Sequence, residues 1–303
     1  MSDLVTAHRR LSANTRGALW MLGSAVAFTL MTTLIKYLGS DYGPMLQTFY
    51  RQLAGLAVLA PIILRDPVGA FRTSRPDIMI FRAGATTLGM ILAFYSYQAL
   101  PLADANALSF TRALWIVPLA LFVLGETVGI HRLAATLVGF AGVVIMLQPS
   151  GEGGGSWLGA AASLGSAFLF AMTVTAMKIA TRDNSTAVLM VWSATLGFFL
   201  SIPLALYEWR WPAFSDFVLL CVMGVLGLAT QFCYIKGMAV GDAVAMAPID
   251  YTRLVFAILL GLVLFQEVPN LLTMAGAAVV IVATLYITIR ESRLKAAPPP
   301  VQE

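Results

Sequence analysis

Ionisable side chains within long apolar segments are the residues of this sequence that could do chemistry. Arg112 lies in the apolar segment 103–124, and Asp250 and Arg253 lie three residues apart in the segment 242–265. A guanidinium can bind a carboxylate or phosphate through two parallel hydrogen bonds, so Arg112 is a candidate anchor for an anionic group. A structural ion pair between helices is the alternative for Arg112. For Asp250 and Arg253 a standing ion pair is favoured, with a gate or a proton-coupled site as the alternative.

Other polar and aromatic residues share these helical faces or depths. Asn106 and Ser109 precede Arg112 at intervals of three residues, so the three side chains lie on one face. Arg51 is either a cavity residue or a snorkelling residue with its stem in lipid. Three further residues could bind a substrate or could only join helices, and for the tryptophan core packing is favoured: Tyr97, Trp115 and Gln231.

Charged residues near the ends of the apolar segments are expected to have structural roles. Asp104 and Asp242 stand near segment starts and are interpreted as N-caps that pair with free backbone N–H groups. Glu126 and Glu267 follow apolar segments, where they could bind helix N-termini or basic residues. Lys36 ends its segment, which favours snorkelling, and the alternative is that it lines a vestibule together with Thr29 and Thr33 on the same face.

The composition is that of a protein whose solvent is mostly lipid. The chain has 303 residues, of which 59% are hydrophobic and 11% charged, with a net charge of +4. Soluble proteins carry about a quarter charged residues, so nucleic-acid binding, disorder and an ordinary soluble enzyme are excluded. The sequence has two histidines, His8 and His131, and no metal-ligand spacing or Gly-rich phosphate loop. We therefore expect no enzyme activity, no metal and no cofactor, and transport that is not driven by ATP.

Long apolar segments organise the chain. About 20 apolar residues cross the hydrocarbon layer as a helix, and only helices or closed barrels satisfy the backbone there. The segments lack strand-like alternation, so we predict an all-α integral membrane protein with ten transmembrane helices. Pro118 and Pro248 are expected to bend two of them. The predicted spans are 17–38, 44–64, 77–98, 103–124, 131–148, 157–179, 186–206, 216–239, 242–265 and 270–290.

The distribution of positive charge predicts the orientation. With ten spans, the two tails (1–16 and 291–303) lie on the same side of the membrane. Among the positively charged residues of the predicted loops and tails, only Arg210 falls on the side opposite the tails. Cytoplasmic loops of membrane proteins are the ones enriched in Arg and Lys. We therefore expect a multi-pass protein of the bacterial inner membrane with both termini in the cytoplasm. The residues on the predicted cytoplasmic side are Arg9, Arg10, Arg16, Arg65, Arg72, Arg75, Arg132, Arg182, Arg290, Arg293 and Lys295.

The two halves of the chain resemble each other. Residues 22–25 and Lys36 recur, at one constant offset, as residues 164–167 and Lys178. Five spans per half is an odd number, so the second copy must be inverted in the membrane. We therefore predict two inverted five-helix repeats, an architecture typical of secondary transporters with a binding site at the repeat interface. The repeats cover 17–148 and 157–290.

Several of these segments together resemble the EamA-type carriers of the drug/metabolite transporter superfamily. They are Tyr97-Gln-Ala-Leu-Pro-Leu-Ala-Asp104-Ala, Leu124-Gly125-Glu126, Asp250-Tyr251-Thr-Arg253-Leu and Phe265-Gln266-Glu267, and the resemblance covers nearly all of 17–290. Gln266 departs from the family, which often has Gly there. The resemblance implies a cavity lined by spans 1, 3, 4, 6, 8 and 9, and it implies these site residues: Tyr97, Arg112, Trp115, Asp250, Tyr251 and Arg253.

The resulting hypothesis is a secondary transporter for a small polar or amphipathic metabolite, working by alternating access across the inner membrane. By the resemblance, the substrate is an amino acid, a vitamin or an S-adenosylmethionine-like cofactor. The midplane arginines favour an anionic group, and Asp250 leaves room for a zwitterion or a proton-coupled step. A lipid or lipid-linked-metabolite flippase is the alternative. The expected partners are the small-molecule substrate and the lipid bilayer, with the protein a monomer or a homodimer.

Overall fold

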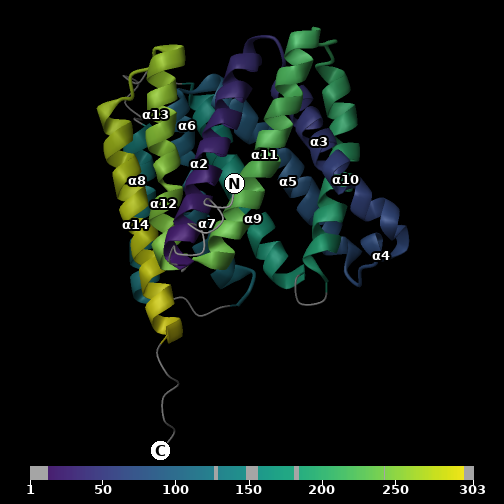
Figure 1. The fold of residues 1–303 in the computed structure, drawn as a ribbon. Coiled ribbons are helices and arrows are strands. Elements are labelled where there is room, and N and C mark those ends of the chain that lie inside the picture. Colours follow the sequence, from purple (N-terminus) through teal and green to yellow (C-terminus); the bar gives the residue numbers. More distant parts are fainter. Residues whose placement is uncertain (1–12, 126–128, 148–155, 181–183, 242, 297–303) are drawn as a thin grey trace, which may run out of the picture.

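The computed structural model describes residues 13–125, 129–147, 156–180, 184–241 and 243–296. Within these residues every regular element is a helix (Figure 1). The elements are α2 (Ala13–Tyr37), the short 3-10 helix η1 (Leu38–Ser40), α3 (Pro44–Arg65), α4 (Pro67–Phe71), α5 (Pro76–Ala99), α6 (Leu102–Ser109), α7 (Arg112–Phe122), α8 (Ile130–Leu147), α9 (Trp157–Ala180), α10 (Thr186–Tyr207), α11 (Phe214–Val240), α12 (Ala243–Asp250), α13 (Thr252–Phe265) and α14 (Leu271–Ala296).

The helices follow the apolar segments of the sequence closely. Nine helical segments of the described chain are long and apolar enough to cross a membrane. Helix α3 is not among them, although its 22 residues would extend about 33 Å. Its first half carries Gln47, Arg51 and Gln52, which lower its hydropathy. Gln47 and Gln52 are buried, so the polar part of α3 faces protein.

Two of the long segments are interrupted near their middle. The first breaks between α6 and α7, at Phe110 and Thr111, and the second breaks between α12 and α13, at Tyr251. The breaks do not fall on the prolines as expected, because Pro118 lies inside α7 and Pro248 inside α12. Around the first break the backbone bonds tighten to the 3-10 pattern, with the N–H groups of Phe110 and Thr111 bonding three residues back.

The helices pack in pairs that join the first half of the chain to the second. Helix α2 packs along α11, α5 along α9, α8 along α14, and α3 along α10. In Figure 1, α2 and α11 cross the centre of the bundle, α8 and α14 lie at one edge, and α3 and α10 lie towards the other. The breaks meet inside this arrangement, since α13 packs against both α2 and α6.

Small residues allow the closest of these approaches. A Cβ atom on Gly142 of α8 would stand 2.8 Å from the carbonyl oxygen of Gly276 in α14, and one on Gly276 would stand 2.5 Å from the carbonyl oxygen of Gly142. Neither position has room for a side chain, so the two backbones touch here as in small-residue interfaces of membrane helices.

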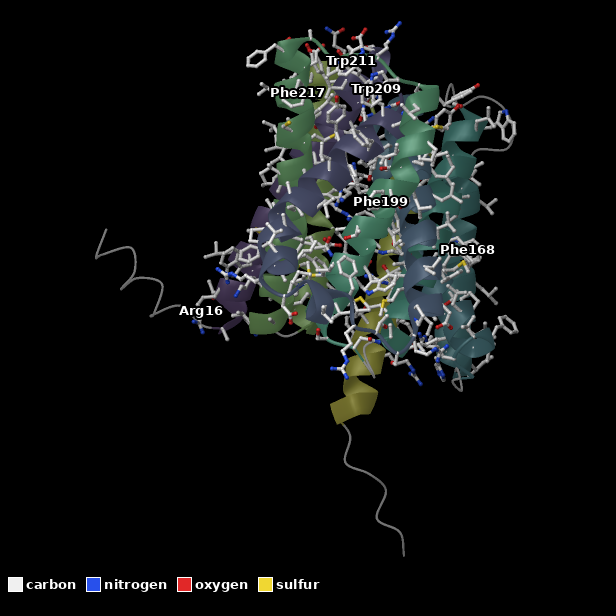
Figure 2. All side chains as sticks on the ribbon, turned by 90° about the vertical axis from the view of Figure 1, so that its right-hand side faces the viewer. Arg16, Phe168, Phe199, Trp209, Trp211 and Phe217 are labelled. Carbon is white, nitrogen blue, oxygen red and sulfur yellow. The ribbon has the colours of Figure 1, made fainter. Side chains whose placement is uncertain are left out.

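The two ends of the bundle differ in composition. Figure 2 shows Trp209, Trp211 and Phe217 near one end and Arg16 near the other. Helix α2 runs from the end with Arg16 to the end with Lys36, which is also the end of the tryptophans. We name these ends the Arg16 end and the Lys36 end.

Candidate functional site

The guanidinium of Arg253 lies between two aromatic rings where the two broken helices meet. Its Cζ atom is 4.8 Å from the ring centroid of Phe28 in α2 and 4.3 Å from that of Phe110 at the first break. Nη2 donates to the Ser109 hydroxyl at 3.3 Å, and it is 3.9 Å from Oδ2 of Asp250. Arg253 is only 8% exposed, and we call these five residues the arginine cage.

Two tyrosines support the rings of this cage. Tyr97 of α5 stands edge-on to Phe28, with 6.3 Å between ring centroids, and Tyr251 stands edge-on to Phe110 at 4.7 Å. The Tyr251 hydroxyl is hydrogen-bonded to the hydroxyl of Thr284 in α14. Because Thr284 already donates to a backbone carbonyl of its own helix, it accepts from Tyr251. The cage is therefore built from three segments distant in sequence, namely α2 and the two helix breaks, and α5 and α14 support it.

Arg112 lies near the cage and is not held by it. It begins α7, directly after the first break, and is half-buried. The cage residue Phe110 stands only two residues before it in the chain. Among the residues that the structure describes, its guanidinium has no hydrogen bond, ion pair or ring contact. The ion pair between helices, which was the alternative role for Arg112, is therefore not formed within the described chain.

Asn106 and Trp115, also predicted for the site, are part of the packing around the first broken helix. Asn106 is fully buried in α6, and its Nδ2 donates to the carbonyl of Leu102 at 2.9 Å, while its Oδ1 has no partner in the described chain. The ring of Trp115 stands edge-on to Phe140 at 4.9 Å and to Phe168 at 5.1 Å. Trp115 thus joins α7 to α8 and α9, the packing role favoured for it from sequence.

Arg51 and Gln231 make no hydrogen bond, ion pair or ring contact with the cage residues within the described chain. The Arg51 side chain rests on α11, where its Nε is 2.9 Å from the place that a Cβ on Gly227 would take, and Met31 lies beside the same glycine. Gln231 is on an exposed stretch of α11, and no polar contact within the described residues joins it to Arg253 or Arg112. Both remain predictions for the site.

A network of charges closes the Lys36 end of the bundle. Lys36 forms an ion pair with Glu267, and its Nζ also donates to the carbonyl of Leu100 at 2.5 Å. Glu267 Oε2 accepts from the backbone N–H of Leu102 at 2.8 Å, so this carboxylate caps the N-terminus of α6. Glu267 thus has the role expected for it, binding both a helix N-terminus and a basic residue.

Two expectations at this end are wrong. Lys36 does not snorkel, because its ammonium is held by Glu267 and only 13% of the side chain is exposed. Asp104 is not the N-cap of α6, since the helix starts at Leu102 and its cap position is Pro101. Proline has no side-chain acceptor, and Glu267 supplies the acceptor from another helix instead. The counterparts Glu126 and Asp242 lie outside the described residues.

A hydrogen bond fixes the short connection after α2, which lies at the Lys36 end of the bundle. The Tyr42 hydroxyl donates to Oδ2 of Asp216 at 2.8 Å, which joins the connection after α2 to the start of α11. Burial, together with this hydrogen bond, raises the pKa of Tyr42, so the hydroxyl stays protonated as a donor.

Phe28, Phe110 and Arg82 are the residues that the sequence interpretation missed. Phenylalanine in an apolar segment carries no sign of its own that it faces a charge. The signal that could have found Phe110 was a repeated motif, an aromatic residue followed by Thr and Arg. This motif occurs at 110–112 and again at 251–253. Arg82 lies early in α5 and donates to the carbonyl of Leu189 in α10 at 2.6 Å, so it ties two helices together.

An apolar hollow of about 260 Å³ lies elsewhere, between α5, α7 and α9. Its lining includes Phe81, Leu119 and Met172 and none of the arginines. Within the described part of the chain, no cluster of three or more His, Cys, Asp or Glu side chains could hold a metal ion.

Comparison with known proteins agrees with a multi-pass transport protein. The EamA-like transporter family matches residues 15–148 and again residues 157–289. The chain is 30% identical to the S-adenosylmethionine uptake transporter of Rickettsia prowazekii over 91% of this chain and 94% of the relative. It is 26% identical to a riboflavin transporter of Vibrio cholerae, over 92% and 94%, and 30% identical to one of Rhizobium johnstonii, over 93% and 94%.

A solved crystal structure shares the fold. It has a TM-score of 0.58 and 23% sequence identity, and the match covers 93% of this chain and 98% of that one. The all-helical fold and these relatives define a membrane transporter of small metabolites. The chain belongs to the EamA-like transporter family.

Proposed function

We propose that the protein carries a zwitterionic metabolite of the S-adenosylmethionine type across the bacterial inner membrane by alternating access. The observation that carries this proposal is the half-buried guanidinium of Arg112 within a span, which has no hydrogen bond, ion pair or ring contact among the described residues. A charge inside the membrane without a partner is unfavourable, and such residues in membrane proteins usually serve a substrate or ion pathway. An incoming carboxylate would supply the partner that Arg112 lacks.

The architecture that we infer is ten spans in two inverted repeats, with α3 as the tenth span. The packing supports it, because exchanging the two halves turns the pair α2–α11 into α9–α5 and leaves the pairs α3–α10 and α8–α14 as they are. Each half also matches the family separately. The repeats then cover 17–148 and 157–290, as the sequence predicts.

The ends of the broken helices fit a substrate that carries both signs of charge. Helices α7 and α13 begin near the middle of their spans, where their N-termini favour an anion. Asp250 keeps 22% of its side chain exposed and is 3.9 Å from Arg253, too far for a hydrogen bond. It can therefore attract a substrate cation while Arg112 binds the carboxylate.

S-adenosylmethionine has these groups: a carboxylate, an ammonium, a sulfonium and a planar base. The relative from Rickettsia is named for its uptake. Riboflavin, for which other relatives are named, offers a planar ring without a carboxylate, so it matches Arg112 less well. We place the Lys36 end on the periplasmic side of the membrane and both termini in the cytoplasm, because the arginines gather at the opposite end.

The test is binding of S-adenosylmethionine to purified protein, measured by calorimetry. Replacing the sulfonium by a thioether, as in S-adenosylhomocysteine, removes one positive charge and should weaken binding to the wild type. Arg112→Gln should weaken binding of both compounds by about 10- to 100-fold, the effect of losing a hydrogen bond to a charged group. Asp250→Asn should remove the preference for the sulfonium.

Arg65→Gln is the matched control, because Arg65 is an exposed arginine at the end of α3. It should bind both compounds like the wild type. Binding that survives Arg112→Gln unchanged would overturn the assigned anchor. Stabilisation by lipids, with no response to any amino acid, flavin, nucleoside or S-adenosylmethionine, would support the flippase alternative instead.

A further inference from the structure

The two arginines at the helix breaks occupy different environments. Arg253 is docked between the rings of Phe28 and Phe110 and donates to Ser109. Arg112 has no ring or polar partner among the described residues. One guanidinium is thus held in an aromatic cage, while the other is free.

These environments belong to positions that are equivalent between the two halves. Phe110, Thr111 and Arg112 correspond to Tyr251, Thr252 and Arg253 at one constant offset, and the same offset relates Ser109 to Asp250. Phe28 corresponds to Phe170 at the offset that relates Lys36 to Lys178. The residues equivalent to the cage rings Phe28 and Phe110 are therefore Phe170 and Tyr251, and the residue equivalent to Arg253 is Arg112.

The helices that would build this second cage are already neighbours. Helix α9, which carries Phe170, packs against α6 and α7 as α2 packs against α12 and α13. The Phe170 ring is half-buried and rests on α5, 3.4 Å from the place that a Cβ on Gly89 would take. A second cage could thus form by a shift of packed helices, without unfolding.

The contacts between helices also differ between the two halves of the chain, as the environments of the two arginines do. Helix α2 packs against α5, and Gly39 of η1 touches Gln98 near the Lys36 end. The equivalent helices, α9 and α11, do not pack along each other in the described part of the chain. The structure is therefore closed at the Lys36 end, with Arg253 docked.

We propose that Phe170 and Tyr251 form a second aromatic cage, which receives Arg112 when the protein opens at the Lys36 end. In that state Arg253 leaves Phe28 and Phe110 and becomes the free arginine. One arginine is then docked in each state, and the other meets the substrate anion. Phe170 is a positioning residue in this scheme, which rests on the inverted repeats and alternating access proposed above.

The experiment measures how often the Lys36 end opens. Ile35 is fully buried in α2 beside Lys36, so a cysteine there reacts with a membrane-impermeant thiol reagent only when this end opens. The reporter Ile35→Cys is placed in a chain that carries Cys221→Ala and Cys233→Ala, and the labelling rate is followed in proteoliposomes without substrate.

Phe28→Leu removes a ring from the occupied cage, so it should raise the labelling rate about fivefold, the effect of one cation–π contact of about 1 kcal/mol. Phe170→Leu removes a ring from the second cage and should lower the rate about fivefold. Phe199→Leu, at a ring that is 59% exposed, should leave the rate unchanged (Figure 2). A general loss of packing would not change the labelling rate in opposite directions in Phe28→Leu and Phe170→Leu.

A rate that rises, or stays unchanged, in Phe170→Leu would overturn the second cage. If Phe170→Leu fails to fold, Arg112→Gln provides the same comparison, because it removes the guanidinium that the second cage receives and should also lower the rate. Labelling needs no substrate, so it is independent of the binding test. Failure to bind any solute would reject the proposed substrate class, while the labelling rates would still decide whether the cage exists.

Discussion

Phe110 and Tyr251, one from each half of the chain, stand edge to face with their ring centroids 4.7 Å apart. Each lies where its span is interrupted, and each is followed by Thr and Arg. The two breaks thus meet through these rings, with Arg253 against the face of one of them. A movement of either broken helix must change the position of the guanidinium that the other half holds.

Thr284 should set the position of Tyr251 and hence of Phe110. Thr284→Val removes the only hydrogen-bond partner that the described residues give the Tyr251 hydroxyl. Losing one such bond is worth about 1 kcal/mol, so we expect S-adenosylmethionine to bind about fivefold more weakly. Calorimetric titration of the purified variant measures this change.

Thr288→Val is the matched control, because among the described residues the Thr288 hydroxyl bonds only to the backbone of its own helix. It should bind like the wild type. If the hydrogen bond to Tyr251 is responsible, Thr284→Val should have no further effect in a Tyr251→Phe background. A full additional loss in that background would show that Thr284 acts by another route.

The ion pair between Lys36 and Glu267 should stabilise the closed Lys36 end. Glu267→Gln retains an acceptor for the N–H of Leu102 but loses the charge that holds Lys36. Breaking a partly buried pair leaves one charge uncompensated, so we expect the free energy of unfolding to fall by about 1–3 kcal/mol. Thermal unfolding in detergent measures the change.

Glu208→Gln provides the comparison, because Glu208 accepts from the backbone N–H of Met45 at 3.1 Å at the start of α3. Among the described contacts it caps a helix as Glu267 does, without a lysine partner. Glu208→Gln should lower the free energy of unfolding by less than Glu267→Gln does. In a Lys36→Met background the two glutamate variants should become similar, and a difference that persists there would contradict the ion-pair explanation.

A disulfide between η1 and α5 should lock the Lys36 end. A Cβ on Gly39 would stand 3.2 Å from the Cβ of Gln98, close to the separation of about 3.8 Å in disulfides. We expect Gly39→Cys with Gln98→Cys to cross-link under oxidation and to stop uptake into proteoliposomes, with recovery on reduction. Each single variant should transport in both conditions. Continued transport by the fully cross-linked protein would show that this end does not open.

Much of the fold could be predicted from sequence because lipid imposes one strong constraint, the internal pairing of every backbone group. Hydropathy therefore located the helices, and buried charge located Arg112, Asp250 and Arg253. The surroundings of Arg253 could not be predicted, because a phenylalanine facing a guanidinium has the same sequence signal as one facing lipid. The break positions were missed for a related reason: they follow from hydroxyl and 3-10 hydrogen bonds, as at Thr111, and not from proline.

Polar residues near span ends were also ambiguous. Lys36 was expected to reach the lipid surface, but its partner Glu267 comes from a connection far away in sequence. A pattern within one segment cannot reveal such a partner. Gln231 illustrates the same limit, since a glutamine within an apolar segment can bind a substrate or only join helices, and its exposed position on α11 leaves both roles open.

The residues after the two broken spans should differ in their tolerance of a side chain. Gly125 has φ 64° and Gln266 has φ 55°, so both take the left-handed conformation that favours glycine. This explains why the family often has Gly at the position of Gln266. We expect Gly125→Ala to lower the free energy of unfolding by about 1 kcal/mol, and Gln266→Gly to raise it by about 0.5 kcal/mol.

Gly129→Ala is the control for the added methyl group, because Gly129 has open space around its Cβ position and no positive φ. It should leave the unfolding temperature unchanged or raise it slightly by restricting the unfolded chain. The three variants are compared by thermal unfolding in the same detergent. An equal effect of Gly125→Ala and Gly129→Ala would show that the left-handed conformation after α7 contributes nothing, and a loss of stability in Gln266→Gly would show that the Gln266 side chain makes a stabilising contact.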